Sequence, residues 1–510
     1  MMRPFFLSFL CLTSVALADL GGTKPNILFI LTDDQGYGDV SAHGNPILKT
    51  PNIDHLRGES VRFSDFMVSP TCAPTRSAIM TGRHEFRNGV THTILERERM
   101  DPKATTIAQV LKTTGYTTGI FGKWHLGDEP EYRPSKRGFD EMFIHGGGGI
   151  GQSYPGSCGD APKNGYFNPA IMHNDKFIKT EGYCTDIFFA QATKWIESVK
   201  GKQPFYCHLA TNAPHAPYIA RPEDKALYDG KVPDDDVANF FGMIHNIDEN
   251  LGKLMAKLDE WGIANNTLVV FMNDNGGTAG VKVFNAGMHG AKGSPWMGGT
   301  RAMSFWRWPG TLNPADCSAL TAHVDVFRTW ADLAGAKLTP AVESQVEGRN
   351  LLPLLEKPDS EWPDRALISH VGRWQKGTDY NEAKTRNASI RIPQYHLVSE
   401  AARPQPAKAK AKSPAQGWQL FDVKADPGET KNIAEQNLEI VKSMLTTYDQ
   451  WWDSLKGQID LNESAKGPKL NPFAKEYWEQ FGGGPTAEDL ERMDPDKAWT
   501  FEARRAKKHN

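Results

Sequence analysis

A cysteine and an arginine lie four residues apart in the most chemically specific segment of the sequence. The segment at 72–76 joins Cys72 to Arg76 with the spacing C-x-P-x-R, and it continues to Gly82 and Arg83. Cysteine is a source of covalent nucleophiles, and an arginine close to it can stabilise negative charge at a reacting centre. The pattern has two wildcards in five positions, so its meaning depends on what other segments supply.

Two apolar runs end in oxygen-bearing side chains. One run ends in Asp33 and Asp34, and the other ends in Asp274 and Asn275. These are hard oxygen ligands with no soft ligand among them, which suits Ca²⁺ or Mg²⁺ far better than zinc. A lone Asp-Asp pair is usually a turn or a helix cap. The prediction of a metal site therefore rests on the pairing of the two segments.

Two further apolar runs end in basic side chains. One leads into Lys123 and His125, and the other leads into His215. In an open α/β sheet, ligands bind beyond the carboxyl ends of the strands. We therefore expect the four strand exits, with their carboxylates, lysine and two histidines, to share one crevice.

The apolar runs are typical of buried strands, and they alternate with helical patterns. This alternation predicts an α/β fold with a large, mostly parallel sheet sandwiched by helices. Apolar residues at helical spacing over 237–258 predict a scaffold helix, on which we expect His245 and Asp248 to be solvated. The glycine run at 145–151 is either a lid or a plain flexible loop.

Several blocks give the chain a family resemblance. They are Gly122-Lys123-Trp124-His125-Leu126-Gly127, Asp274-Asn275-Gly276-Gly277, Gly290-Ala291-Lys292-Gly293, Gly298-Gly299-Thr300-Arg301, Trp418-Gln419-Leu420-Phe421-Asp422 and Asp426-Pro427-Gly428-Glu429. With the segment at 72–76, they make the chain from Lys24 to about Ala434 resemble the formylglycine-dependent (type I) sulfatases, arylsulfatase-like members of the alkaline phosphatase superfamily. Met297 and Ala302-Met303 depart from the family's usual Glu and Val-Pro, which affects a supporting loop and fine specificity.

The resemblance implies a cofactor and a modified residue. It implies one Ca²⁺ per chain, and it implies that a separate formylglycine-generating enzyme oxidises Cys72 to formylglycine (3-oxoalanine). In the family, one hydroxyl of the hydrated aldehyde attacks sulfur, and the second then loses a proton so that sulfate is expelled. The implied metal ligands are Asp33, Asp34, Cys72, Asp274 and Asn275.

The resemblance also implies roles for the basic residues. Lys123 and Lys292 match sulfate-binding lysines, and Arg76 matches the arginine that supports the hydrate. His125 matches the residue that takes the proton of the second hydroxyl. His215 matches the histidine that faces the leaving oxygen with Lys292 and acts as general acid, so the substrate-binding groups would be Lys123, His215 and Lys292.

The expected function is calcium-dependent hydrolysis of an organic sulfate ester, a sulfated carbohydrate above all, to an alcohol and inorganic sulfate. One alternative is a phosphonate monoester or phosphodiester hydrolase of the same superfamily. A second is a non-catalytic glycan-binding relative, against which the presence of every expected group counts. His370, Arg373 and Trp374 could line a sugar subsite, and they could equally be ordinary surface residues.

Composition and the amino terminus indicate an exported protein. The 510 residues carry a formal net charge of -3, so no whole-protein field favours nucleic acid or an anionic membrane. Residues 1–18 have a basic residue, a short apolar stretch and a small-x-small end, which predicts a secretory signal peptide and a periplasmic or secreted protein. A short membrane anchor is the alternative, although the stretch falls short of about 20 apolar residues.

We expect a catalytic domain over 24–365, an α+β C-terminal subdomain over 366–460 and a polar tail over 461–510. Within the subdomain, the Ala/Pro/Lys-rich stretch at 401–416 is predicted to be a mobile hairpin loop and 441–455 an amphipathic helix. A disulfide between Cys158 and Cys184 is as plausible as two free thiols. Cys207, within an apolar strand, is predicted to be a buried thiol.

Overall fold

A ten-stranded sheet organises the computed structural model, which describes residues 19–154, 156–374, 378–400, 417–459 and 470–492. The central strands β9, β1, β8, β4 and β5 are parallel to one another, and β11 and β6 flank them in the antiparallel direction. In spatial order the strands are β12 (Ala315–Cys317), β2 (Val61–Phe63), β11 (Ser304–Arg307), β9 (Thr267–Asn273), β1 (Asn26–Thr32), β8 (Phe205–Ala210), β4 (Thr117–Lys123), β5 (Glu141–His145), β6 (Ala170–His173) and β7 (Lys176–Lys179).

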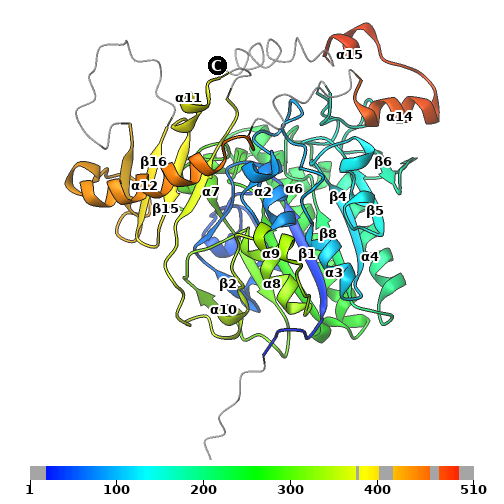
Figure 1. The fold of residues 1–510 in the computed structure, drawn as a ribbon. Coiled ribbons are helices and arrows are strands. Elements are labelled where there is room, and N and C mark those ends of the chain that lie inside the picture. Colours follow the sequence, from blue (N-terminus) through cyan, green and yellow to red (C-terminus); the bar gives the residue numbers. More distant parts are fainter. Residues whose placement is uncertain (1–18, 155, 375–377, 401–416, 460–469, 493–510) are drawn as a thin grey trace, which may run out of the picture.

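Helices lie on both faces of this sheet (Figure 1). The helices of the main domain are α1 (Pro51–Gly58), α2 (Cys72–Thr81), α3 (Ile107–Thr113), α4 (Cys184–Val199), α5 (Pro222–Ala226), α6 (Asp235–Glu260), α7 (Met297–Thr300), α8 (Asp325–Leu333), α9 (Pro340–Gln345) and α10 (Leu352–Glu356). The same domain contains a small sheet of β10 (Arg301–Ala302), β3 (Phe66–Met67) and β13 (Thr321–Ala322).

The strand β1 shows how the two apolar layers form. Ile27, Phe29 and Leu31 pack in one cluster with residues of α2, α3 and α8, whereas Leu28 and Ile30 pack in a second cluster with residues of α1, α4 and α6. Successive side chains of a strand point to opposite faces of the sheet. A strand that is apolar at every position is therefore covered on both sides, which confirms the predicted α/β sandwich.

A second unit follows the main domain. Its antiparallel sheet has the order β14 (Leu367–His370), β15 (Ala388–Arg391), β16 (Tyr395–Ser399) and β17 (Gln419–Asp422), with α11 (Tyr380–Lys384) before β15. The predicted amphipathic helix is confirmed as α12 (Leu438–Ser454), which buries its apolar side against this sheet. The stretch predicted as a mobile loop, 401–416, lies outside the described residues.

Two helices occupy the described part of the segment predicted to be a polar tail. They are α14 (Pro472–Phe481) and α15 (Ala487–Arg492). Phe473 is fully buried in the main apolar cluster, and the Gln480 side chain bonds both backbone groups of Phe177 in β7. The helix α14 is thus packed against β7, at the edge of the main sheet.

One expectation about α6 is wrong. His245 is partly exposed, but Asp248 is buried, with 1% of its surface exposed. Its carboxylate accepts hydrogen bonds from the backbone N–H groups of Asn52 (3.2 Å) and Ile53 (2.7 Å). N–H groups in the first turn of a helix have no partner within the helix. The N-cap residue of α1, Thr50, does not accept a hydrogen bond from them with its side chain. Asp248 caps a helix from a distant segment.

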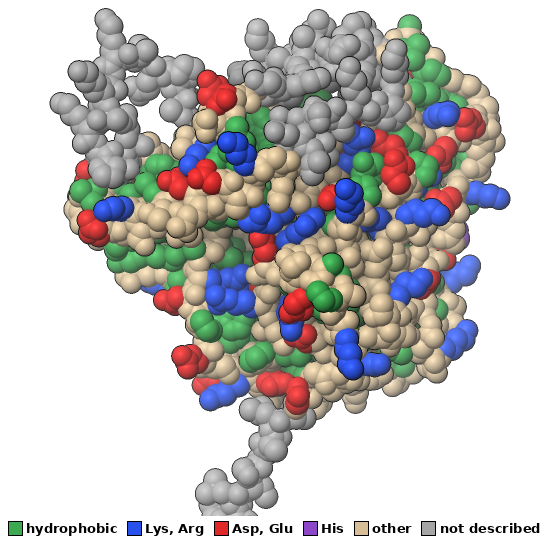
Figure 2. Space-filling model, viewed as in Figure 1, with side chains coloured by type: hydrophobic (Ala, Val, Ile, Leu, Met, Phe, Trp, Pro, Cys, Tyr) green, Lys and Arg blue, Asp and Glu red, His purple; other side chains and the backbone are tan. Residues whose placement is uncertain are grey.

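The surface carries no dominant charge. On the face drawn in Figure 2, acidic and basic side chains are interspersed among neutral ones, in line with the net charge of -3. Among the described residues, no helix combines the length and the apolar character that a bilayer crossing requires. The predicted signal peptide, 1–18, lies outside them.

Candidate active site

The acidic side chains meet where β1 and β9 end. The two strands pair in parallel with Thr32 opposite Asn273, so the residues that follow lie side by side. The Asp34 N–H donates to Asp274 Oδ1 (3.3 Å), and Asn275 Nδ2 donates to Asp34 Oδ1 (3.0 Å). The structure thus brings together the four predicted oxygen ligands from two strand exits.

Cys72 is the first residue of α2, and its side chain points into the same cluster. Its Sγ and one carboxylate oxygen each of Asp33 and Asp274 lie within 4.8 Å of one another. Pro74 fits here because the first turn of a helix does not use its N–H groups in the helix. Cys72 is a buried free thiol, with 2% of its surface exposed.

Each carboxylate in the cluster pairs with a cation from a different element. Lys123 Nζ lies 2.6 Å from Asp33 Oδ2, with both side chains fully buried. Arg76 Nη2 lies 2.8 Å from Asp274 Oδ2, and Arg76 Nε lies 3.0 Å from the same oxygen. The ammonium of Lys292 bonds Asp34. Buried charges require such partners, so β4, α2 and the loop after β9 are held together at this point.

The surroundings of the carboxylates differ in their electrostatic effect. Burial raises the pKa of Asp33 well above its ordinary value, although Lys123 opposes the shift. Burial acts on Asp34 in the same direction, but Lys292, His215 and Lys123 together outweigh it and hold the pKa of Asp34 below its ordinary value. The pKa of Lys292 is raised, because Asp34 outweighs the effect of burial. Asp34 is therefore held as an anion more firmly than Asp33.

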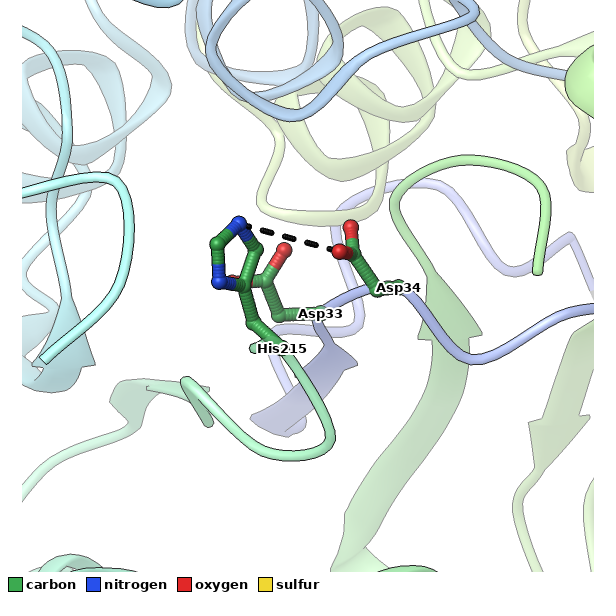
Figure 3. Close-up of side chains that lie close together, drawn as sticks. All are labelled: Asp33, Asp34 and His215. Atoms are coloured by element: carbon green, nitrogen blue, oxygen red, sulfur yellow. Dashed lines mark ion pairs between the residues drawn. The ribbon is translucent and has the colours of Figure 1, made fainter. Parts of the chain in front are cut away.

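The two predicted histidines come from different strand exits. His215 comes from the loop after β8, and its Nε2 lies 3.7 Å from Asp34 Oδ2 (Figure 3). Its Nδ1 donates to the carbonyl oxygen of Ala216 (2.6 Å), which leaves Nε2 as the atom that gains or loses a proton. Burial, opposed by Asp34, lowers the pKa of His215 to about 3.

His125 follows β4 with a left-handed backbone, at φ 61°. Its Nε2 donates to the carbonyl oxygen of Thr93 (2.7 Å), and its Nδ1 is buried without a hydrogen-bond partner among the described residues. Burial, reinforced by the charge of Lys123, lowers the pKa of His125 well below its ordinary value. A neutral His125 therefore presents a free lone pair on Nδ1.

The donor set fits a hard divalent cation. Among the described residues, Asp33 Oδ1 and Asn275 Oδ1 are buried and accept no hydrogen bond. An acceptor oxygen that loses water without gaining a donor is costly, and a cation supplies the missing contact. These two oxygens belong to residues that the sequence predicted as ligands.

The Lys292 loop is hydrogen-bonded to two other segments of the site. Lys292 N–H donates to the Gly277 carbonyl oxygen (3.1 Å), and Gly293 N–H donates to that of Pro70 (2.8 Å), just before Cys72. Further along, Met297 N–H donates to the buried carboxylate of Glu429 (3.0 Å), which also pairs with His396 of β16. The second unit thus supports the loop that carries Lys292.

The glycine run packs against the two histidines. A Cβ at Gly148 would lie 3.2 Å from the His125 ring, and one at Gly149 would lie 2.6 Å from His215 Nδ1. A side chain at Gly149 would therefore displace the histidine. The run had a signal in the sequence, because glycine permits close backbone approach. Thr93, which orients His125, had none.

The three residues predicted as a possible sugar subsite differ in their exposure to solvent. His370 and Trp374 are buried, 1% and 5% exposed, beside Phe86 and Trp452 in the core of the second unit. Arg373 between them is exposed. The subsite interpretation is wrong for His370 and Trp374, because their rings fill the core.

The cysteines of the chain, within the described residues, are free. Cys158 Sγ donates to the Thr93 carbonyl oxygen (3.3 Å) and Cys184 Sγ donates to Asn212 Oδ1 (3.0 Å), so the possible disulfide is absent. Cys207 is fully buried in β8, as predicted. Each thiol other than Cys72 thus has a structural environment.

Comparisons with known proteins agree with this geometry. Residues 25–336 match the model of the family described as Sulfatase. The chain is 32% identical over 356 residues to the N-acetylgalactosamine-6-sulfatase of Homo sapiens, covering 65% of this chain and 66% of the relative, just under two thirds. It is 27% identical over 489 residues to the arylsulfatase J of Mus musculus, covering 89% and 79%.

Solved structures give the same result. Ps i-CgsB, crystallised in complex with k-i-k-neocarrahexaose, superposes with a TM-score of 0.73 at 29% identity, covering 90% of this chain and 97% of that chain. The phosphonate monoester hydrolase of Agrobacterium radiobacter, with a TM-score of 0.56 at 18% identity over 85% and 96% of the two chains, shares the fold alone. The chain therefore belongs to the sulfatase family and is a sulfuric ester hydrolase of the alkaline phosphatase superfamily.

Proposed function

We propose that this sulfatase releases inorganic sulfate from a sulfated carbohydrate, using calcium and a formylglycine derived from Cys72. The observation that carries the proposal is the position of Cys72 at the start of α2, with its Sγ within 4.8 Å of Asp33 and Asp274 oxygens. We further propose that residues 1–18 direct the export of the protein from the cytoplasm. A separate formylglycine-generating enzyme would modify Cys72 before or during export.

The metal would be held by Asp33, Asp34, Asp274, Asn275 and the side chain at position 72. All five come from buried positions around one point, and two of their oxygens lack donors among the described residues. When bound, the cation would polarise a sulfate oxygen and make the attacking hydroxyl more acidic. The oxygen-rich donor set favours calcium or magnesium, and the family resemblance favours calcium.

The chain's own cations would neutralise charge on the sulfuryl group. Lys123 and Lys292 reach the cluster from two different elements, and each is paired with a carboxylate that the metal would share. Arg76, anchored on Asp274 and on the Lys123 carbonyl oxygen, would support the nucleophile. Preorganised cations of this kind stabilise charge as it develops in the transition state.

Proton transfers would fall to the two histidines. The free Nδ1 lone pair of buried His125 supports a role as proton acceptor. His215 Nε2 would deliver a proton to the leaving oxygen, and the nearby charge of Asp34 favours the protonated ring that this role requires, against the burial that lowers its pKa.

Carbohydrate is the inferred substrate class for two reasons. Several relatives are named for a sugar sulfate, such as N-acetylgalactosamine-6-sulfatase, and the similar Ps i-CgsB was solved with k-i-k-neocarrahexaose. A panel of defined sulfated oligosaccharides, assayed for free sulfate beside a phosphate diester and a phosphonate monoester, tests the proposal. Release of sulfate from at least one sugar, faster than any phosphorus ester is cleaved, is expected. Preferred cleavage of a phosphorus ester contradicts it.

Modification of Cys72 is tested by mass and by substitution. The tryptic peptide that contains Cys72 from active enzyme should have the mass of the aldehyde or its hydrate, and Cys72→Ala should abolish sulfate release. Cys207→Ala is the matched control, since this buried thiol lies within β8 and should leave the rate within about twofold. Full activity with Cys72 entirely as a thiol contradicts the mechanism.

Metal dependence is tested by chelation. Removing the cation should abolish sulfate release and leave the Asp33, Asp34 and Asp274 charges without their shared partner, so thermal stability should fall as well. Calcium at 100 times its Kd should restore both, adding about 2.7 kcal/mol to the free energy of unfolding. Full activity and unchanged melting after chelation, with the metal content shown to be zero, would count against the site.

A further inference from the structure

Arg373 has an unusual backbone conformation at the junction of the two units. It follows β14 by three residues and has φ 54°, in the left-handed region that side chains rarely adopt. The conformation is held from both sides, because Arg373 N–H donates to the Thr91 carbonyl oxygen (3.2 Å) and Gly372 N–H donates to His370 Nδ1 (2.8 Å). Outliers of this kind cluster at functional sites, because the surrounding structure must hold them.

The side chain of Arg373 reaches the margin of the active site. Its Nη2 donates to Thr93 Oγ1 (3.2 Å), and the carbonyl oxygen of Thr93 is the acceptor for His125. Its Nη1 lies 3.8 Å from the place that a Cβ on Gly293 would occupy, and Gly293 follows Lys292. The guanidinium therefore lies between the support of one catalytic histidine and the loop of a sulfate-binding lysine.

The charge of Arg373 differs from the other positive charges of the site. Lys123, Lys292 and Arg76 are each bonded to a carboxylate. Arg373 is exposed, and no carboxylate within the described ranges lies in ion-pair distance of it. A guanidinium has five N–H donors, and one bond to Thr93 leaves most of them available. Within the described part of the chain, the guanidinium of Arg373 thus has no carboxylate partner and is available to an anion of the substrate.

We propose that Arg373 binds a second anionic group of the substrate, a sulfate ester or a carboxylate on the sugar ring that carries the scissile sulfate or on its neighbour. Arginine pairs with planar or tetrahedral oxyanions through two parallel N–H···O bonds, which lysine cannot reproduce. This inference rests on the proposed function and adds to it that the preferred substrate is a polyanionic sugar, selected by charge at the margin of the site.

A supporting role for Arg373 has to be separated from this one. Through Thr93 the side chain could merely stiffen the segment that orients His125. Loss of such support would slow every substrate by a similar factor, mainly in kcat. Loss of an anion contact would raise KM, and only for substrates that carry the second anion.

The experiment compares three substrates that share one sugar backbone: singly sulfated, doubly sulfated, and sulfated with one carboxylate. They are tested on wild type, Arg373→Ala and Arg373→Lys. Arg328→Ala is the control. Its side chain lies on α8, where the carbonyl oxygens of Asp332 and Leu333 bond Gly22 and Lys24 before β1, at the opposite end of the sheet.

Arg373→Ala should lower kcat/KM for at least one doubly charged substrate, relative to the singly sulfated one, by about 10- to 100-fold through KM. Arg373→Lys should recover part of that ratio, and Arg328→Ala should not change it. The arm that responds identifies sulfate or carboxylate as the second group.

Two results overturn the inference in distinguishable ways. An equal fall for all three substrates in Arg373→Ala, or no change in either doubly charged arm, assigns Arg373 a structural role while the sulfatase proposal stands. Failure of the wild type to release sulfate from any of the three sugars contradicts the proposed carbohydrate substrate itself, and this inference falls with it.

Discussion

Three buried carboxylates and three cations occupy the centre of the site. Removing a charged group from water costs several kcal/mol. Deleting one partner of a buried ion pair leaves the other charge uncompensated and destabilises a protein by about 3–5 kcal/mol. Asp33, Asp34 and Asp274 are therefore tolerated only because Lys123, Lys292 and Arg76 reach them. The same groups that carry the proposed chemistry also hold the strand exits together.

The proposed role of His215 as general acid predicts that the rate depends on the leaving group. A sugar alkoxide is a poor leaving group, so loss of the general acid in His215→Ala should slow sugar sulfates by roughly 10² to 10⁴. Nitrophenolate leaves without help, so nitrophenyl sulfate should be slowed much less. The rates of both substrates are to be measured on one preparation.

Lys123→Ala is the comparison for this test, because a lost sulfate contact should impair both substrates alike. Equal slowing of both substrates in His215→Ala would assign His215 to sulfate binding and remove it from proton transfer.

At the scale of elements, α7 and the loop before it depend on the second unit. Glu429 is 2% exposed and accepts hydrogen bonds from Met297 N–H (3.0 Å) and from His396 Nδ1. The loop after β17, held by His396 of the C-terminal sheet, therefore supports the loop that carries Lys292.

Glu429→Ala should lower both stability and activity. It leaves two buried donors without an acceptor, each of which costs about 1–3 kcal/mol. The free energy of unfolding, measured in denaturant, should fall accordingly, and kcat should fall because the Lys292 loop is released. Glu435→Ala, at an exposed position, should change neither. A Glu429→Ala enzyme with wild-type stability and rate would contradict this dependence.

Much of the element scale could be predicted from the sequence. β1 and β9 are apolar at nearly every position, the pattern of parallel strands covered on both faces, and their polar ends mark the site. Asp248 could not be predicted as buried, because helical periodicity does not reveal that α1 needs a cap from a distant residue. His370 and Trp374 were equally undetermined, since aromatic residues suit both a sugar subsite and a core.

At the scale of the whole molecule, several buried carboxyl groups make stability depend on pH. Burial raises the pKa of Asp39, Glu85 and Glu98 to about 7 in each case. A raised folded-state pKa means that the folded protein holds the proton more tightly than the unfolded chain. For Glu98, this stability is complete below pH 4.5 and is lost as the pH rises toward 7.

Glu98→Gln removes this loss. At 1.36 kcal/mol per pKa unit, the variant should gain about 3 kcal/mol over wild type between pH 4 and pH 8 in the free energy of unfolding. Urea unfolding at the two pH values gives the difference. Glu260→Gln, at an exposed position of α6, should show no such gain. A Glu98→Gln difference that is constant with pH would refute the assignment.

The burial of Cys72 also limits the time during which the proposed modification can take place. Once α2 is packed and the Lys292 loop is in place, only 2% of the surface of Cys72 is exposed. A modifying enzyme could not bind so small an exposed surface. The proposed oxidation would have to occur after this segment leaves the ribosome and before Glu429, which is synthesised much later, fixes the loop. The yield of active enzyme should therefore depend on whether Cys72 is oxidised before folding buries it. Slower synthesis after residue 72 should raise the modified fraction.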